Sequence, residues 1–376
     1  MKKLKLLTVI GTRPEIIRLA EIIKLADNIY DHILVHTGQN YDYSLNDIFF
    51  KDLGLREPNY FLSVAGNNLG ETIGNVISKS YDVLVKEKPD ALLVLGDTNS
   101  VLCTIAAKRL KIPIFHMESG NRCFDQNVPE EINRKISDHI SDINLTYTEH
   151  SRRYLLSEGF RKDHIFVTGS PLFEVLSIHK TEIEQSMILD KLNLINNKYF
   201  VISAHREENI DLADNFIKLC DALNAVAEKY SMQIIFSTHP RTLKQIENKK
   251  IKFHSLISVM PPFGFFDYIK LQKNAYCVLS DSGTISEESA MINFPAISIR
   301  TSTERPEAID AGTIVLGGIT KNEILNSIDL CLKTHISNIK KIPWEYEIPD
   351  VSRRVIRIIQ SYTNIVNKVI WNKENE

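Results

Sequence analysis

Acidic side chains gather where buried segments of this chain are expected to end. Asp97 comes just after the apolar run 91–95, and Glu118 comes after the run 112–115. A further acidic pair at 130–131 opens a segment of helical character, and we expect Glu131 to face the site. Ionisable groups at the end of a buried strand are costly unless they do chemistry. Paired carboxylates there would suit general acid and base catalysis.

These carboxylates also have simpler explanations. Asp97 precedes a predicted helix and could cap it. Glu130 and Glu131 could merely complement a helix dipole. The strands before Asp97 and Glu118 are expected to be neighbours, however, and ligands bind at the carboxyl ends of strands in open α/β sheets. This favours an acid/base site, to which His116 and Arg122 are expected to add ligand contacts.

The first turn of the chain has the pattern of an anion site. The apolar run 4–10 is followed by Gly11, Thr12, Arg13 and Pro14, which suits a strand, a tight turn and a helix start. Exposed N–H groups and Arg13 could hold a phosphate there, and Arg18 adds a second positive charge. The alternative is an ordinary turn with a solvated arginine.

The second half of the chain supplies two histidine turns. His205 follows the run 199–203, and His239 follows the run 233–237. A histidine at a strand end is more often structural than catalytic, so a structural role is favoured for His239, which is kept as a candidate contact to the ligand. His205 would be better placed if it faces the carboxylates across a cleft.

Two more turns follow in the second half. Ser282 and Gly283 fit a phosphate site at a helix N-terminus. Thr284 and Glu287 match a capping box, which leaves Glu288 free to accept hydrogen bonds from a ribose diol. A last turn, 300–307, has the sequence RTSTERPE, and its Arg300 is a candidate ligand contact. The alternative for that turn is a salt-bridged surface segment.

The elements that position these residues alternate between short apolar runs and longer amphipathic ones. One series of expected strands comprises 4–10, 32–36, 91–95, 112–115, 143–147 and 165–167. After a polar, helix-prone stretch at 176–198, a second series comprises 199–203, 233–237, 256–259, 275–279, 296–299 and 313–315. Alternation of this kind predicts parallel sheets with helices on both faces. We expect two doubly wound α/β domains, 1–175 and 176–350, with a terminal helix from 351 that packs back on the first.

The composition of the chain limits the kinds of molecule that it is expected to bind. The 376 residues carry a formal net charge of −2, so no basic field points to nucleic acid or to a membrane surface. The five cysteines are scattered without metal-ligand spacing, which favours reduced thiols over disulfides or zinc. The apolar run near the N-terminus is too short for a signal peptide, and no run is long enough to span a membrane. We expect a cytoplasmic enzyme that acts on a small molecule.

Seven ordered motifs resemble the non-hydrolysing UDP-N-acetylglucosamine 2-epimerases. They are GTRPE at 11–15, GDT at 96–98, HMESG with NR at 116–122, PEE at 129–131, HREEN at 205–209, SDSG with EE at 280–288, and TERPE at 303–307. The resemblance implies a fold similar to the GT-B glycosyltransferases, with two Rossmann-like domains. It also implies that the second domain makes most of the UDP contacts and that the protein is a homodimer, as is usual in the family. It implies that the enzyme needs no metal and no NAD. The sequence also lacks the GxGxxG fingerprint of a dinucleotide-binding site.

The resemblance also implies a reaction. UDP leaves sugar C1 as the C2 proton is removed, a 2-acetamidoglycal forms, and UDP adds back with C2 protonated from the other face. Asp97, Glu118 and Glu131 would be the acid/base carboxylates, with His205 at the leaving phosphate. The binding contacts would come from Arg13 at the diphosphate, Ser282 and Gly283 around it, and Glu288 at the ribose.

The chain departs from the common family pattern at several positions. It has Ser119, Asn121, Arg18 and Glu207 where Ala, Leu, Lys and a second Arg are usual, and Asn40 replaces a usual His. The segment around Asn40 holds an allosteric substrate site in many bacterial members, so that regulation is not implied here. The segment 118–125 is closer to a branch that converts UDP-2-acetamido-2,6-dideoxy-L-talose to UDP-N-acetyl-L-fucosamine.

Two functions of other classes are alternatives to the epimerase. A GT-B glycosyltransferase would share the fold and the UDP contacts but needs no base for a C2 proton. A non-catalytic nucleotide-sugar sensor would tolerate loss of the three carboxylates. Because all three are present, the epimerase is favoured over both.

Overall fold

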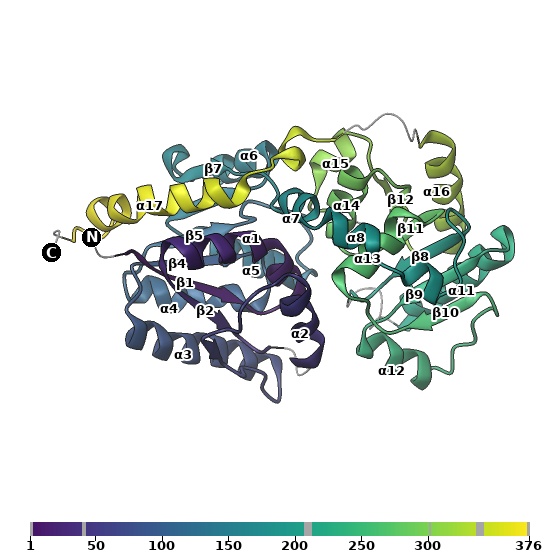
Figure 1. The fold of residues 1–376 in the computed structure, drawn as a ribbon, viewed down its shortest axis with the longest axis horizontal. Coiled ribbons are helices and arrows are strands. Elements are labelled where there is room, and N and C mark those ends of the chain that lie inside the picture. The colour runs from purple at the N-terminus through teal and green to yellow at the C-terminus, as the bar shows by residue number, and fades with distance from the viewer. Residues whose placement is uncertain (1–2, 40–42, 207–212, 301, 336–341, 374–376) are drawn as a thin grey trace. The chain divides into compact units, whose positions relative to one another are not determined.

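The computed structural model describes residues 3–39, 43–206, 213–300, 302–335 and 342–373. The chain divides into two compact units, Met1–Ser177 with Glu345–Glu376, and Ile178–Trp344. Each is described below by itself. Figure 1 draws the first unit in purple and blue with a yellow final helix, and the second in teal and green.

The first unit contains a seven-stranded parallel sheet. Its strand order is β3-β2-β1-β4-β5-β6-β7. The strands are β1 (Lys5–Ile10), β2 (Asp31–His36), β3 (Tyr60–Phe61), β4 (Ala91–Leu95), β5 (Ile114–Met117), β6 (Ile143–Thr146) and β7 (Ile165–Val167). The helices are α1 (Arg13–Ile29), α2 (Tyr43–Asp52), α3 (Leu69–Glu87), η1 (Asn99–Leu102), α4 (Cys103–Arg109), α5 (Pro129–Ile140), α6 (Glu149–Ser157), η2 (Lys162–His164), α7 (Leu172–Ile178), η3 (Trp344–Glu347) and α17 (Val351–Val369).

The second unit contains a six-stranded parallel sheet with strand order β10-β9-β8-β11-β12-β13. Its strands are β8 (Tyr199–Ser203), β9 (Gln233–Ser237), β10 (Ile257–Met260), β11 (Cys277–Ser280), β12 (Ala296–Ser298) and β13 (Val315–Leu316). Its helices are α8 (Lys180–Gln185), α9 (Ile188–Lys191), α11 (Ala213–Tyr230), α12 (Pro240–Asn248), α13 (Phe265–Lys273), α14 (Thr284–Ile292), α15 (Pro306–Asp310) and α16 (Lys321–Thr334). The predicted fold class, two Rossmann-like α/β units, is confirmed.

Strand side chains alternate between two buried layers, as expected for a sheet covered on both faces. In the second unit Phe200 and Ile202 belong to a core that includes side chains of α11 and α16. Their neighbours Tyr199 and Val201 belong to a separate core on the other face, together with Leu271 of α13. This two-sided burial explains why the strands are continuous apolar runs in the sequence.

Strand order places a topological switch point in each unit. In the first sheet β1 pairs with β2 on one side and with β4 on the other. In the second sheet β8 lies in the same way between β9 and β11. Chains leave the two central strands toward opposite faces at such a point, which opens a crevice at their carboxyl ends. The segments after β1, β4, β8 and β11 are therefore where ligand contacts are expected.

The final helix, α17, belongs to the first unit. The Tyr30 hydroxyl at the end of α1 donates to the Ile356 carbonyl of α17 at 2.8 Å. At the start of α17, the Ser352 N–H donates to Glu174 at 2.8 Å. The chain thus returns to its first unit after completing the second.

Several elements differ from the prediction. Strand β5 begins and ends two residues later than expected, so His116 lies within the strand instead of after it. The helix predicted after Asp97 begins as the short 3-10 helix η1 (Asn99–Leu102) before α4 starts at Cys103. Strand β3 was not predicted, because two residues carry no detectable alternation.

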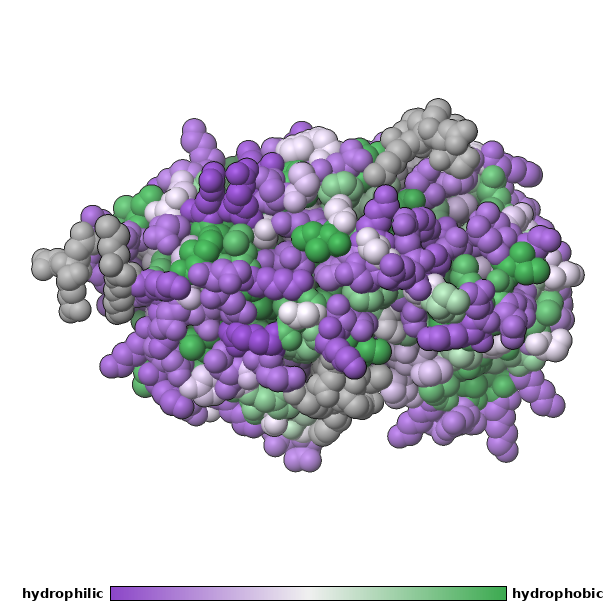
Figure 2. All heavy atoms as spheres, viewed as in Figure 1, coloured by the Kyte–Doolittle hydropathy of each residue, from purple (hydrophilic) through white to green (hydrophobic). Residues whose placement is uncertain are grey.

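The face of the molecule in Figure 2 is mostly hydrophilic, with apolar residues scattered over it. Within the ranges that the structure describes, no helix is both long and apolar enough to cross a membrane. All five cysteines are buried and free.

Candidate active site

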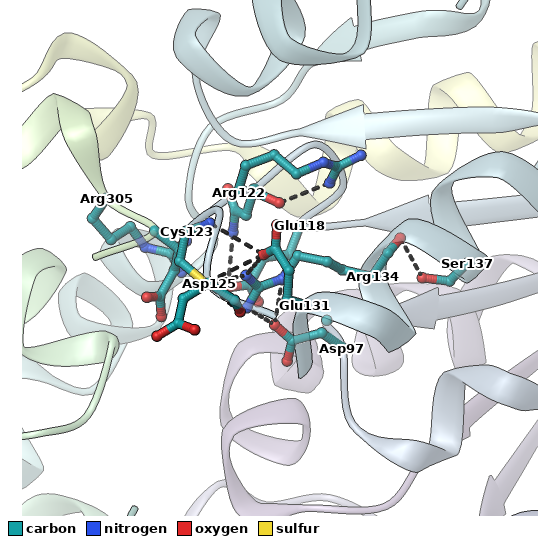
Figure 3. Close-up of polar contacts among 12 residues, drawn as sticks. Asp97, Glu118, Arg122, Cys123, Asp125, Glu131, Arg134, Ser137 and Arg305 are labelled. Atoms are coloured by element: carbon teal, nitrogen blue, oxygen red, sulfur yellow. Dashed lines mark hydrogen bonds and ion pairs between the residues drawn. The ribbon is translucent and has the colours of Figure 1, made fainter. Parts of the chain in front are cut away.

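The three predicted carboxylates lie in one part of the first unit. Strands β4 and β5 are parallel neighbours, with Leu95 opposite Met117. The turns that follow them therefore bring Asp97 and Glu118 to the same edge of the sheet. Glu131 is in the first turn of α5, and Figure 3 shows all three carboxylates in the same cluster.

An arginine that sequence analysis did not single out joins two of these carboxylates. Arg134 donates from Nη2 to Asp97 Oδ2 at 2.5 Å and from Nε to the same oxygen at 3.1 Å. Its Nη1 donates to Glu131 Oε2 at 2.6 Å. Arg134 is three residues after Glu131 on one helix, a spacing that brings side chains together. That spacing is the one sequence signal that could have identified it.

Glu118 has an unusual backbone and a cationic partner. Its φ is +62°, in the left-handed region that non-glycine residues seldom adopt. Its Oε2 accepts a hydrogen bond from Nη1 of Arg18, which is 5% exposed on α1. Strained backbone of this kind is tolerated where the surroundings hold it, and it is common at functional sites. Arg18, expected at a phosphate, is paired with a carboxylate in this structure.

His116 and Arg122, which were expected to add ligand contacts, are both buried and bonded to groups of the protein. His116 is 0% exposed, with Nε2 2.7 Å from the Gly96 carbonyl and Nδ1 2.9 Å from Asp138. Arg122 is 1% exposed, and its fork donates to Glu158 at 2.8 and 2.7 Å.

Asp138, on the buried side of α5, contacts both His116 and Arg122. Its carboxylate accepts from Arg122 Nη1 at 2.7 Å and from the Gly120 N–H at 3.1 Å. Gly120 has a φ of +79°, and a Cβ there would be 2.5 Å from the Ser151 carbonyl. His116, Arg122 and Asp138 therefore fix the loop that carries Glu118.

Electrostatics keep Glu131 ionised. Burial raises the pKa of Glu131, but the N–H of Cys123 and the charge of Arg134 outweigh burial, and the net pKa is below its ordinary value. The Cys123 N–H lies 3.1 Å from Glu131 Oε2. For Asp138 burial likewise raises the pKa, but the hydrogen bond from His116 and the Arg122 charge outweigh burial, and the net pKa is below its ordinary value. Glu131 and Asp138 therefore stay ionised at neutral pH, each beside an arginine.

The first turn does not have the expected form. The N–H groups of Gly11 and Thr12, predicted to face a phosphate, instead donate to the carboxylate of Glu15. Arg13 begins α1, and its guanidinium lies 5.9 Å from the centre of the Phe49 ring. The amide groups of this turn are therefore occupied by the protein itself, and Arg13 alone is left as its candidate phosphate contact.

In the second unit the switch point presents His205 and Asp281. The backbone N–H groups of His205 and Arg206 both donate to Asp281 Oδ2 at 2.9 Å. His205 Nδ1 lies 3.3 Å from Asp281 Oδ1. The histidine side chain is 44% exposed, whereas Asp281 is fully buried. Asp281, the aspartate of the SDSG motif, thus orients a histidine whose side chain is exposed.

The turn before α14 carries the predicted phosphate contacts Ser282 and Gly283. A Cβ at position 283 would be 2.3 Å from Glu304 Oε1. Glu304 in turn accepts from Arg300 Nη1 at 2.7 Å and from Arg206 Nη2 at 3.4 Å. Arg300 is 4% exposed, so this turn combines a helix start with two arginines and a carboxylate.

Three expectations around α14 and α12 are clarified. The capping box was wrong: Thr284 is the first residue of α14, and Glu287 is bound instead by Arg305 at 2.8 Å. Glu288, expected at a ribose, accepts a hydrogen bond from Gln272 at 2.6 Å. His239 is the N-cap of α12, which agrees with its structural alternative.

Some sequence features lie outside the described residues, namely 40–42 and the residues 207–209 that complete the HREEN motif. In the part of the chain that is described, no group of three or more His, Cys, Asp or Glu side chains is arranged to hold a metal ion.

Comparison with known proteins places this geometry in a family. The two parallel-sheet units are of the GT-B-like class. The family model of UDP-N-acetylglucosamine 2-epimerase matches residues 24–360, and the chain belongs to that family. It is therefore an epimerase, a kind of isomerase, and the predicted family is confirmed.

Solved structures and a curated relative support the same family assignment. The UDP-N-acetylglucosamine 2-epimerase of Rickettsia bellii is 48% identical with a TM-score of 0.92, covering 99% of this chain and 100% of that one. That of Methanocaldococcus jannaschii, in complex with UDP-GlcNAc and UDP, is 34% identical with a TM-score of 0.88, covering 95% and 100%. A Pseudomonas aeruginosa UDP-2,3-diacetamido-2,3-dideoxy-D-glucuronate 2-epimerase is 33% identical, covering 86% of this chain and 91% of its own.

Proposed function

We propose that this enzyme is a non-hydrolysing UDP-N-acetylhexosamine 2-epimerase that interconverts UDP-N-acetylglucosamine and UDP-N-acetylmannosamine. The observation that carries the proposal is the cluster of Asp97, Glu118 and Glu131 with Arg134 and Arg18. Inversion at C2 needs a base on one face of the sugar and an acid on the other. Three carboxylates at one sheet edge supply both functions within one unit.

The reaction proceeds by elimination and re-addition. A carboxylate removes the C2 proton, the C–H electron pair forms the C1–C2 double bond, and the C1–O bond breaks with its electrons on UDP. The resulting 2-acetamidoglycal is then attacked by UDP at C1 while a second group protonates C2 from the opposite face. Because the C2 proton is not adjacent to a carbonyl, its loss depends on stabilising the departing diphosphate.

The residues of the second unit match that requirement. His205, held by Asp281, would assist at the leaving phosphate. Ser282 and Gly283 would contact the diphosphate, and Glu288 would bind the ribose diol. Arg13 of the first unit would add a positive charge at the diphosphate.

In this mechanism Arg134 positions two of the carboxylates. It holds Asp97 and Glu131 through separate nitrogens, 2.5 and 2.6 Å away. A shared cation keeps both side chains in fixed rotamers, and for Glu131 it favours the ionised form. One can then accept a proton while the other remains charged, so that a base is present throughout the cycle.

The test is turnover of UDP-N-acetylglucosamine by the purified protein, followed by proton NMR. We expect UDP-N-acetylmannosamine to accumulate to equilibrium, and small amounts of free UDP and 2-acetamidoglycal to appear. Asp97→Asn should abolish formation of the epimer and of the 2-acetamidoglycal while leaving UDP binding intact. A wild-type protein that releases UDP and free sugar without forming the epimer would contradict the non-hydrolysing reaction.

The alternative substrate is UDP-2-acetamido-2,6-dideoxy-L-talose, converted to UDP-N-acetyl-L-fucosamine by the same chemistry. The segment 118–125 favours it, and the name of the Pseudomonas relative indicates that substrates vary among similar chains. Parallel assays of the two nucleotide sugars decide between them by their kcat/KM values.

We also propose that the enzyme works in the cytoplasm as a homodimer, in keeping with the family it belongs to. Sedimentation analysis at micromolar concentration tests the dimer. Fractionation of cells that express the chain tests its location.

A further inference from the structure

Glu15 is a buried acid to which the proposed mechanism gives no task. It lies in the first turn of α1 and is 2% exposed. One carboxylate oxygen, Oε2, accepts from the N–H groups of Gly11 and Thr12, the second at 3.1 Å. The other, Oε1, accepts from the hydroxyls of Thr98 at 2.5 Å and Ser100 at 2.8 Å. Four donors therefore converge on one side chain.

These donors come from two different turns at the switch point. Gly11 and Thr12 form the turn after β1, which leads directly to Arg13. Thr98 and Ser100 belong to the turn after β4, and Thr98 is the residue next to Asp97. The Glu15 carboxylate is thus a hydrogen-bonded link between the turn that bears a candidate phosphate contact and the turn that bears a candidate catalytic acid.

Close packing leaves this link little freedom. A Cβ at Gly11 would lie 2.4 Å from Thr37 Oγ1 and 3.0 Å from Ser100 Cβ, so the two turns approach each other without space for a larger residue. All four donors are neutral. Burial raises the pKa of Glu15 to about 7 despite the hydrogen bonds that lower it. Among the described residues, the nearby titratable group that responds to this carboxylate is the Cys103 thiol, whose pKa is raised by burial and then by the Glu15 charge.

A buried carboxyl without a cation is a costly way to stabilise a fold. An apolar side chain in the first turn of α1 could fill the same volume but could not accept hydrogen bonds from both turns. We propose that Glu15 is a positioning residue that holds Arg13 and Asp97 in a common frame. The proposal rests on the proposed epimerase function for its effect on turnover.

The test compares two substitutions of Glu15 that differ in hydrogen bonding. Glu15→Leu removes every acceptor, so both turns lose their link. Glu15→Gln keeps an acceptor for the N–H groups of Gly11 and Thr12, and its NH₂ can donate to the two hydroxyls after they rotate. We expect kcat/KM to fall at least 100-fold in Glu15→Leu, through both kcat and KM, and less than 10-fold in Glu15→Gln.

Hydrogen exchange gives a second readout that does not depend on activity. In Glu15→Leu, amides at 10–13 and at 96–100 should exchange at least 10-fold faster than in wild type, with Glu15→Gln close to wild type. The matched control is Glu21→Leu on the same helix, where Glu21 pairs with Lys24 at 2.7 Å. That variant should leave exchange in both segments and turnover unchanged.

A pair of hydroxyl variants covers the case in which Glu15→Leu does not fold. Thr98→Val with Ser100→Ala removes the link from the other side, and should speed exchange at 10–13, across the link from the substitutions. Unchanged exchange in both segments, or a Glu15→Gln as impaired as Glu15→Leu, would overturn the proposal. If the wild type has no epimerase activity the proposed function fails, and exchange alone still decides the role of Glu15.

Discussion

Replacing Arg134 tests the structure most severely, because one side chain serves two carboxylates. Arg134→Gln leaves Glu131, whose side chain is 1% exposed, with the more distant Lys135 ammonium at 3.6 Å. It also removes both hydrogen bonds that Arg134 donates to Asp97, whose side chain is 25% exposed. Removing one member of a buried ion pair typically costs about 3–5 kcal/mol. For a unit of this size that corresponds to a fall of roughly 6–20 °C in Tm.

The pH dependence of this effect has a definite sign. The folded-state pKa of Glu131 lies below its ordinary value, since the Cys123 N–H and the Arg134 charge outweigh burial. A carboxyl with a lowered pKa contributes stability above its unfolded pKa of about 4.3 and loses it as the pH falls through the folded value. The Tm difference between wild type and Arg134→Gln should therefore be largest near pH 7 and shrink below about pH 4.

Arg134→Gln should also lower the rate of catalysis. Loss of both carboxylate contacts is expected to lower kcat by at least about 100-fold, equivalent to roughly 3 kcal/mol. Arg134→Lys keeps the charge but not the fork, and should fall between wild type and Arg134→Gln. Scanning calorimetry at several pH values and steady-state kinetics measure both effects. A Tm within 2 °C of wild type at pH 7, with unchanged kcat, would refute the assignment of Arg134.

Three further outcomes follow from the same structure. Asp97→Asn should cut kcat by orders of magnitude with UDP affinity little changed, and a near-normal kcat would remove Asp97 from the mechanism. Gly283→Ala should weaken UDP binding about 10-fold by calorimetry, because its Cβ would lie 2.3 Å from a Glu304 oxygen, whereas Gly74→Ala, with open space around it, should not. Glu15 has a pKa raised from 4.5 to about 7, so its stabilising contribution is lost as the pH rises through 7, by about 3 kcal/mol in all. Glu15→Gln should therefore be more stable than wild type at pH 8 but not at pH 5, and the same difference at both pH values would contradict that assignment.

Much of the fold could be predicted because the strands are buried on both faces and read as short apolar runs. The ranges 91–95, 165–167, 199–203 and 233–237 coincide with observed strands. Errors occurred where the local signal is weak, as in β3, or where a polar residue lies inside a strand. His116 is such a residue: its partners, the Gly96 carbonyl and Asp138, come from other segments and cannot be read from its neighbours in sequence.

The candidate site was predictable in its acids and less so in its partners. Strand order alone brings Asp97 beside Glu118. The ion pairs of Arg134 and Arg18 depend on where α5 and α1 pack, which a single sequence does not specify. The first turn shows the same limit, since the N–H groups of Gly11 and Thr12 had the pattern of a phosphate site but bind Glu15.

The most direct test of the central claim is proton NMR of the wild-type enzyme with UDP-N-acetylglucosamine in deuterated water. Removal of the C2 proton by a carboxylate and reprotonation from solvent-exchanged groups should place deuterium at C2 of the product epimer as it forms. The C2 proton signal of that epimer should then be missing from the first turnover. Formation of an epimer that keeps its C2 proton, or no exchange at all, would contradict elimination through the carboxylate cluster.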